Sequence, residues 1–285
     1  MINIQKMRLC EKTKEIIAEI ERRTARESYR ISLETKRKRK PFITDSKIGG
    51  LPYWPISMEY PTNSKGQKLV LLAQINFDKE NVETPLPKKG LLQFFISNDE
   101  DDLMMGLDLE HPDVQDGFRV VYHDEIDDSV TAEQVEELGI KRAEEYSAVP
   151  VERECLIKLV KKTCYITPDF PDDFDAIVNA ILFDIFHEDK GELDAYDYFG
   201  DELDEIRRVL GENSLNNVLG YPYFTQSDPR NDNYYDTVLL QLDSISDEDE
   251  DILLWGDVGI GNFFINWEDL KRRDFSKVLY NWDCP

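Results

Sequence analysis

Two phrases, GGLPYW at residues 49–54 and LGYPYF at residues 219–224, place a glycine, a proline, a tyrosine and a second aromatic residue in the same order, 170 positions apart. Glycine permits a tight bend, and proline holds its own backbone in one conformation. Two adjacent aromatic side chains bury a large apolar area. Each phrase therefore predicts a bend that carries its aromatic side chains into a core.

Three further phrases recur in the same order. LLAQI, with Gln74, corresponds to LLQL, with Gln241, and GLLQFFI from Gly90 corresponds to GIGNFFI from Gly259. DGFRVVY, ending at Tyr122, corresponds to RDFSKVLY, ending at Tyr280. Recurrence in order, with nearly constant spacing for the first three phrases, indicates an internal duplication.

The duplication predicts the fold class. We expect an α+β fold of two duplicated, mainly antiparallel β-rich halves related by a pseudo-two-fold axis, with an N-terminal helix and a helical insert between the halves. The predicted segments are an N-terminal amphipathic helix and basic arm (1–48), a first β-rich repeat (49–123), a helical insert (124–218) and a second β-rich repeat (219–285). Residues 49–285 are expected to form one body.

Apolar periodicity predicts the local elements. Ile4, Met7, Ile16, Ile17 and Ile20 recur at helical spacing among charges, which indicates an amphipathic N-terminal helix. A helix with a Thr131 cap and a helix ended by Gly211 are also expected. In full, the predicted strands are 28–34, 68–77, 90–97, 118–123 and 154–162. The predicted helices after the N-terminal one are 131–146, 171–186 and 199–211.

The charge is strongly acidic and unevenly distributed. The net charge of the chain is −25, but residues 1–41 contain 13 basic and 6 acidic residues, a net of +7. The remaining body, with a net charge of −32, repels nucleic acid and anionic membranes and attracts basic proteins or cations. The basic run Lys36–Lys40 has two interpretations. The favoured one is a solvated loop, or lysines that protect an edge strand from pairing with another chain. The other is a nucleic-acid-binding or localisation patch.

Other features bound the location and the chemistry. No stretch of eighteen apolar residues occurs, and the N-terminus lacks the apolar run of a secretory signal, so a cytoplasmic protein without a membrane span is expected. Four scattered cysteines and three histidines lack the spacing of a zinc site, and neither P-loop nor GxSxG motifs occur. We therefore predict no cofactor, no metal and no catalytic residue.

A loop of the second repeat is the best candidate site. SDPRND at 227–232 gathers Asp228, Arg230 and Asp232 and has no evident equivalent in the first repeat. Asp257, in the glycine-rich WGDVGIG segment, could bind a cation, although a turn role is favoured. The aromatic residues of the two phrases complete the candidate binding set, although burial in the core is favoured for them: Tyr53, Trp54, Tyr223 and Phe224.

The combination of DSKIGGLPYWP, LLAQINF, GLLQFFIS, LGYPYFTQSDPR, LLQLDS, WGDVGIGNFFI and YNWDC resembles the bacterial YwqG-like family, from about residue 44 to the C-terminus. The resemblance implies a cytosolic bacterial protein whose family is a domain of unknown function. It supplies no catalytic residues. It also implies an immunity or antitoxin-like role, because some relatives are thought to lie near polymorphic-toxin genes.

Two functions from different classes follow. The acidic body and the absence of a catalytic motif favour a non-catalytic module that binds a basic protein, such as a toxin domain. The sequence predicts no oligomeric state. The alternative is an enzyme or small-ligand-binding protein with its site between the halves, near Asp228, Arg230 and Asp257. Nucleic-acid binding through Lys36–Lys40 is the least favoured function.

Overall fold

The computed structural model describes residues 9–35, 39, 41–100, 104–211, 215–231, 233–247 and 250–285. The chain divides into two compact units. We call residues 1–28 and 162–214 the helical unit, and residues 29–161 and 215–285 the sheet unit. The boundary between the units falls within two strands, β1 and β6, and the domain limits at residues 49, 124 and 219 remain a prediction.

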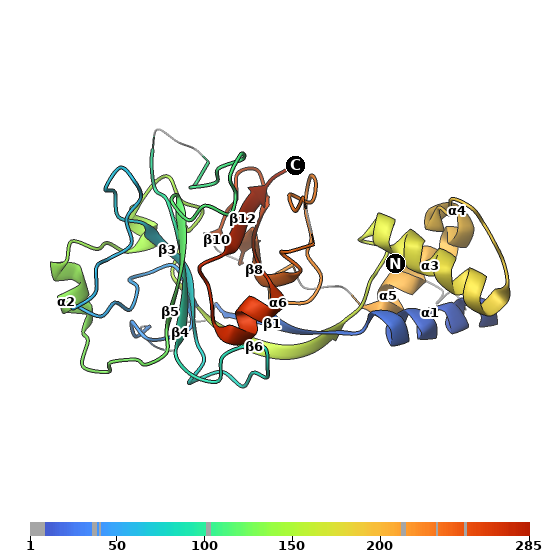
Figure 1. Ribbon diagram of the computed structural model, residues 1–285, viewed down its shortest axis with the longest axis horizontal. Coiled ribbons are helices and arrows are strands. Elements are labelled where there is room, and N and C mark those ends of the chain that lie inside the picture. Colours follow the sequence, from blue (N-terminus) through green and yellow to red (C-terminus); the bar gives the residue numbers. More distant parts are fainter. Residues whose placement is uncertain are drawn as a thin grey trace. The chain divides into compact units, whose positions relative to one another are not determined.

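A mostly antiparallel sheet dominates the chain, so the β-rich α+β class is confirmed (Figure 1). The order of its described strands is β12-β11-β8-β7-β1-β6-β2-β3-β4-β5. A short antiparallel pair, β9 and β10, lies outside this sheet. The strands are β1 (Arg26–Glu34), β2 (Lys47–Ile48), β3 (Val70–Asn76), β4 (Leu91–Ile96), β5 (Phe118–His123), β6 (Cys155–Cys164), β7 (Asn217–Leu219), β8 (Thr237–Asp243), β9 (Ile245–Ser246), β10 (Asp251–Leu253), β11 (Ile260–Ile265) and β12 (Val278–Asp283).

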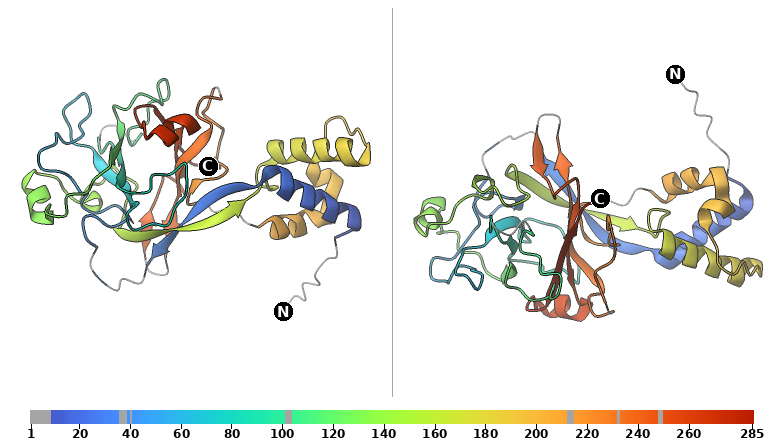
Figure 2. Two further views of the ribbon diagram at one scale, coloured as in Figure 1. Left: turned by 60° about the horizontal axis from the view of Figure 1, so that its bottom comes forward. Right: turned by 90° about the horizontal axis from the view of Figure 1, so that it is seen from above.

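Within the sheet unit, the strands near the two ends of the sheet face each other across one core. Figure 2 shows β3–β5, in cyan to green, opposite β8, β11 and β12, in orange to red. Phe94 of β4 contacts Phe263 of β11 with ring centroids 5.0 Å apart, and Phe118 of β5 contacts Tyr280 of β12 at 5.2 Å. Because β3, β4 and β11 are buried on both faces, their sequences are nearly continuous apolar runs.

The helical unit has its own core. Ile16, Ile17 and Ile20 of α1 are buried in one cluster with Phe174 and Val178 of α3. This burial explains the helical spacing of the three isoleucines, whereas Ile4 and Met7 lie outside the described residues. No helix in the described ranges is long and apolar enough to cross a membrane. The helices of the chain are α1 (Glu11–Thr24), α2 (Ala132–Glu137), η1 (Ala143–Glu145), α3 (Pro171–Phe186), α4 (Ala195–Phe199), η2 (Gly200–Glu202), α5 (Leu203–Leu210) and α6 (Trp267–Arg272).

The local predictions differ from the structure mainly in one helix. The helix predicted over 171–186 is confirmed as α3, which begins at Pro171. The helix predicted over 131–146 begins at the Thr131 capping box but ends after six residues. Gly139, with a φ of 70°, turns the chain there. The rest of the predicted helix is a loop and the short turn η1, so the predicted length was wrong.

Phe263→Ala is expected to lower the free energy of unfolding of the sheet unit by about 3–5 kcal/mol, because it leaves a cavity between the rings of Phe94 and Tyr280. The control, Phe42→Ala, truncates a side chain that is 65% exposed and should cost less than about 1 kcal/mol. Urea unfolding followed by tryptophan fluorescence measures both, since every tryptophan belongs to the sheet unit: Trp54, Trp255, Trp267 and Trp282. Equal losses of unfolding free energy in the two variants would contradict the claim that the Phe263 ring fills the core of the sheet unit.

Candidate functional site

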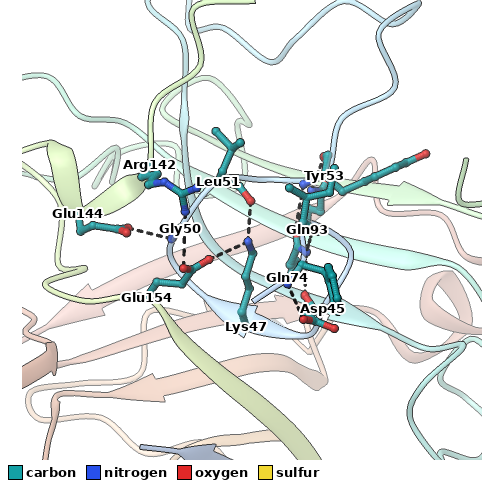
Figure 3. Close-up of polar contacts among 12 residues, drawn as sticks. Asp45, Lys47, Gly50, Leu51, Tyr53, Gln74, Gln93, Arg142, Glu144 and Glu154 are labelled. Carbon is teal, nitrogen blue, oxygen red and sulfur yellow. Dashed lines mark hydrogen bonds and ion pairs between the residues drawn. The ribbon is translucent and has the colours of Figure 1, made fainter. Parts of the chain in front are cut away.

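A buried lysine lies two residues before the first of the two repeated phrases. Lys47, on β2, pairs with Gln74 of β3 on one side and with Leu156 of β6 on the other. Only 1% of its side chain is exposed. Its ammonium group donates to the carbonyl oxygen of Leu51 at 2.6 Å and to Oε1 of Glu154 at 3.0 Å (Figure 3). Lys47 thus joins the bend after β2 to the residue that precedes β6.

Two glycines make this close approach possible. Gly49 and Gly50 have φ angles of 64° and 72°, in the left-handed region that favours glycine. A Cβ atom on Gly50 would overlap the Glu154 carboxylate, and one on Gly49 would overlap the side chain of Val151. The N–H of Gly50 also donates to Oε2 of Glu144 at 3.0 Å. The glycine pair therefore lets two carboxylates lie against the backbone of the bend.

Arg142 is the second cation of the site, and it immediately precedes η1. Its guanidinium nitrogens lie 3.6 Å from Oε2 of Glu154 and 3.8 Å from Oε1 of Glu136. Both separations are longer than a hydrogen bond, and 24% of the side chain is exposed. Glu154 therefore lies between two cations and directs one oxygen toward each of them (Figure 3).

Lys47, Arg142 and Glu154 border a hollow of about 360 Å³. This volume falls at the lower end of the range for small-molecule sites, roughly 300–1,000 Å³. Six of the other nine wall residues are apolar, and Asp128 is the fourth charged residue of the wall. The remaining lining residues are Pro41, Phe42, Ile43, Thr44, Leu51, Asp128, Val130, Thr131 and Ala132.

Burial lowers the pKa of Lys47 below its ordinary value, because removal from water disfavours the charged ammonium. The charge and hydrogen bond of Glu154 oppose this effect, and the positive charge of Arg142 adds to it. The site therefore holds its charges in a poorly hydrated environment, where an unsatisfied polar group is costly.

Buried amides continue from Lys47 into the core (Figure 3). Oε1 of Gln74 accepts the backbone N–H of Tyr53 at 3.2 Å, and Nε2 of Gln93 donates to the Tyr53 carbonyl oxygen at 2.8 Å. The two amides join through a 3.1 Å hydrogen bond, and Oε1 of Gln93 lies 2.9 Å from Nε2 of His123. Side chains from β3 and β4 therefore satisfy the backbone of Tyr53 on both sides.

The second repeated phrase has corresponding bonds. Oε1 of Gln241, on β8, accepts the N–H of Tyr223 at 2.7 Å, and Nδ2 of Asn262, on β11, donates to the Tyr223 carbonyl oxygen at 3.0 Å. The residue that pairs with Gln241 is Asn217 of β7, just as Lys47 of β2 pairs with Gln74. A neutral amide thus occupies the register position that a charged lysine occupies in the other strand pair.

The loop at 227–231 forms a local ion pair. Arg230 donates to both carboxylate oxygens of Asp228, with its Nε 2.8 Å from Oδ1 and its Nη2 2.5 Å from Oδ2. The guanidinium also donates to the carbonyl oxygen of Tyr235 at 3.2 Å and lies 4.8 Å from the centroid of Phe264. Arg230 is therefore already engaged by its own loop, and Asp232 lies outside the described residues.

The other predicted site residues are dispersed. Tyr53 and Trp54 are buried, whereas Tyr223 and Phe224 are half-buried, and the Phe224 ring lies 6.0 Å from the guanidinium of Arg230. Asp257 is exposed in the turn Gly256–Val258. In the part of the chain that the structure describes, no hydrogen bond or ion pair joins it to Asp228 or Arg230.

Sequence reasoning missed Lys47, Arg142 and Glu154. The available signal was the 170-residue offset of the repeated phrases, which aligns Lys47 with Asn217. A charged residue just before a phrase that enters the core needs a partner. No local pattern points to Glu154, which lies 107 positions further along the chain.

A second hollow in the sheet unit, of about 500 Å³, has an acidic lining. Asp99 is buried there and pairs with Lys65 at 2.6 Å. Asp108 and Glu110 are exposed, and between them Leu109 leaves 74% of its surface in solvent. Val114, also on the wall, is 53% exposed, so carboxylates and apolar side chains alternate around this hollow.

Neither hollow resembles a metal centre. Within the described ranges, no group of three or more His, Cys, Asp or Glu side chains could hold a metal ion. The free cysteines Cys10, Cys155, Cys164 and Cys284 do not pair with one another.

A family model described as a domain of unknown function, DUF1963, matches residues 46–284. The chain belongs to this family. The matched region begins one residue before Lys47 and includes the second hollow and the two repeated phrases. Four residues that line the first hollow, Pro41–Thr44, precede it. No curated protein matches the chain. The DUF1963 domain thus contains Lys47, Arg142 and Glu154, while the description of the family assigns no chemistry to them.

Gly50→Ala in the DUF1963 domain is expected to cost at least about 2 kcal/mol more in unfolding free energy than Gly66→Ala. Both glycines have similar φ angles, 72° and 77°, so the backbone strain of alanine is matched at about 1–3 kcal/mol. Only at Gly50 does the new Cβ meet a carboxylate, that of Glu154, whereas Gly66 has open space around it. Urea unfolding of the two variants tests this. Equal losses of unfolding free energy would show that the Glu154 side chain moves aside with no loss of stability.

His123 is expected to make the DUF1963 domain less stable in acid. Burial lowers the pKa of His123 to about 4. Between pH 6.5 and 4 the imidazole is therefore protonated in the unfolded chain but remains neutral in the folded chain. The stability advantage of the wild type over His123→Gln should therefore shrink by about 3 kcal/mol as the pH falls through this window. The control is His111→Gln, an exposed histidine of the same unit. Urea unfolding at several pH values measures both differences, and a constant difference for His123→Gln would refute the assignment.

Proposed function

We propose that this chain is a YwqG-like, cytoplasmic bacterial protein without catalytic activity, and that its acidic sheet unit recognises a basic protein partner in an immunity or antitoxin-like role. The observation that carries the proposal is the second hollow, where exposed Leu109 and Val114 lie beside Asp108 and Glu110. Protein interfaces combine an apolar centre with a polar rim, and these residues offer both.

The charge of the chain supports a basic partner. A net charge of −25 attracts basic proteins over a distance of about 10 Å at moderate ionic strength and raises the rate of encounter. Attraction of this kind is not specific, because any cationic surface benefits from it. Specificity would come from burial of Leu109, which is worth about 1.5–3 kcal/mol when complete.

The proposal includes the duplication. The sheet order supports two halves related by a pseudo-two-fold axis, since β2-β3-β4-β5 and β7-β8-β11-β12 extend in opposite directions from the central β1 and β6. The paired amides that hold Tyr53 and Tyr223 support it as well. In this arrangement, the acidic hollow belongs to the first half alone, as expected when one copy of a duplicated element acquires a separate function.

The test is capture of partners from the cytosol of the source organism, with quantitative mass spectrometry at low and at moderate salt. The wild type should retain one basic protein at nearly stoichiometric level, and Leu109→Ser/Glu110→Lys should retain at least about tenfold less of it. The matched control is Asp257→Lys/Val258→Ser, which changes the net charge equally at another exposed acidic–apolar pair.

The control variant separates recognition from bulk charge. Retention by the control and loss in the Leu109→Ser/Glu110→Lys variant would support the proposal. Equal loss in both double variants would assign the association to net charge alone, and equal retention in both would exclude this hollow as the binding surface.

A further inference from the structure

We propose that the hollow bordered by Lys47, Arg142 and Glu154 binds a small organic monocarboxylate. This inference goes beyond the protein partner proposed above, because the two hollows share no lining residue. It concerns a ligand site that lies wholly within the sheet unit.

The first argument is a spare donor on Lys47. An ammonium group carries three N–H donors. Two of them bond the carbonyl oxygen of Leu51 and Oε1 of Glu154, and among the described residues no acceptor takes the third. With 1% of the side chain exposed, bulk water does not replace that acceptor, so a ligand oxygen in the hollow would satisfy a buried donor.

The second argument is the guanidinium of Arg142. Its two ion pairs, at 3.6 and 3.8 Å, are too long for hydrogen bonds, and no side-chain hydrogen bond from Arg142 occurs in the described part of the chain. A guanidinium presents five N–H donors in a planar fork that matches a carboxylate. Arg142 therefore has its donors available on the wall of the same hollow as the spare donor of Lys47.

The third argument is the charge of the hollow. Lys47 and Arg142 are the two cations of the wall, and the buried carboxylate of Glu154 lies between them. Glu144 and Glu136 do not line the hollow, and Asp128 is an exposed wall residue. A monoanion adds less negative charge to this poorly hydrated site than a phosphate dianion would, which favours a carboxylate over a phosphate.

The fourth argument comes from the register-matched position in β7. Asn217 occupies there the place that Lys47 occupies in β2. Its Nδ2 donates to the carbonyl oxygen of Leu219, and its Oδ1 accepts a hydrogen bond from Nε2 of Gln241 at 3.1 Å. A neutral amide thus suffices to join the strand to the bend that follows it. The structural connection alone does not require a buried charge at Lys47, which leaves the charge available for a ligand.

The walls indicate the rest of the ligand. Phe42, Ile43, Leu51 and Val130 provide apolar surface, and the volume of about 360 Å³ admits only a small molecule. The carboxylate would point toward Arg142 and Lys47, and a short hydrocarbon or aromatic body would contact the apolar wall.

The test uses ¹⁹F NMR on the full chain with two carboxylate probes, trifluoroacetate and 4-fluorobenzoate, each compared with its neutral amide. At least one carboxylate should bind at least about tenfold more tightly than its amide, as expected for a charge-assisted hydrogen bond. Inorganic phosphate at equal ionic strength should compete weakly. If neither carboxylate binds better than its amide, or if phosphate binds best, the proposal is wrong; neither outcome requires a variant.

A pair of variants locates the site. Arg142→Gln should weaken carboxylate binding at least about tenfold, whereas Arg119→Gln, which removes the same charge from another hollow of the sheet unit, should leave it unchanged. Equal binding by both variants would overturn the assignment to Arg142. If Arg142→Gln does not fold, Arg142→Lys keeps the charge and loses the planar fork, and an unchanged affinity in that variant would overturn the assignment as well.

Discussion

The backbone of Tyr53 is buried, and the requirement that its N–H and C=O groups find partners constrains much of the sheet unit. Gln74 and Gln93, from adjacent strands, bond the two groups, and Gln241 and Asn262 do the same for Tyr223. An unpaired buried amide costs about 1–3 kcal/mol, so a strand pair that slipped by one residue would lose these bonds. The amides therefore connect the position of each bend to the register of the strands beneath it.

The Lys47 site depends on the same arrangement. Lys47 on β2 pairs with Gln74 on β3. The register that brings the Gln74 amide to the backbone of Tyr53 therefore also brings the Lys47 ammonium to the carbonyl oxygen of Leu51. The adjacent Gly50 then admits the Glu154 carboxylate to the lysine. A buried ion pair gains stability only when additional hydrogen bonds satisfy its atoms. In this site Leu51 provides one such bond, and the hollow leaves further donors on Lys47 and Arg142 for a ligand.

Sequence patterns predicted the regular elements well where one physical signal dominates. Helix α3 follows from its apolar stripe with Pro171 and two aspartates in its first turn, and strands β3 to β5 follow from apolar runs bounded by turn residues. The helix predicted over 131–146 was too long, because its charged sequence has high helix propensity while Gly139 turns the chain. The candidate site in the 227–232 loop was predicted from charged residues close together in sequence. In the structure Asp228 and Arg230 bond each other, so their polar groups are already occupied and are not free to bind a ligand.

The β-rich α+β fold follows from local features of the sequence, namely the apolar periods and the repeated Gly-x-Pro-Tyr-aromatic phrases, and the acidic charge is also set by composition. The meeting of Lys47, Arg142 and Glu154 at one hollow is visible only in the folded chain. The reason is that periodicity reflects which side chains are buried along one element, over a few residues. A contact between charges 107 positions apart depends instead on the path of the chain, here on the pairing of β2 with β6 and on the turn after α2.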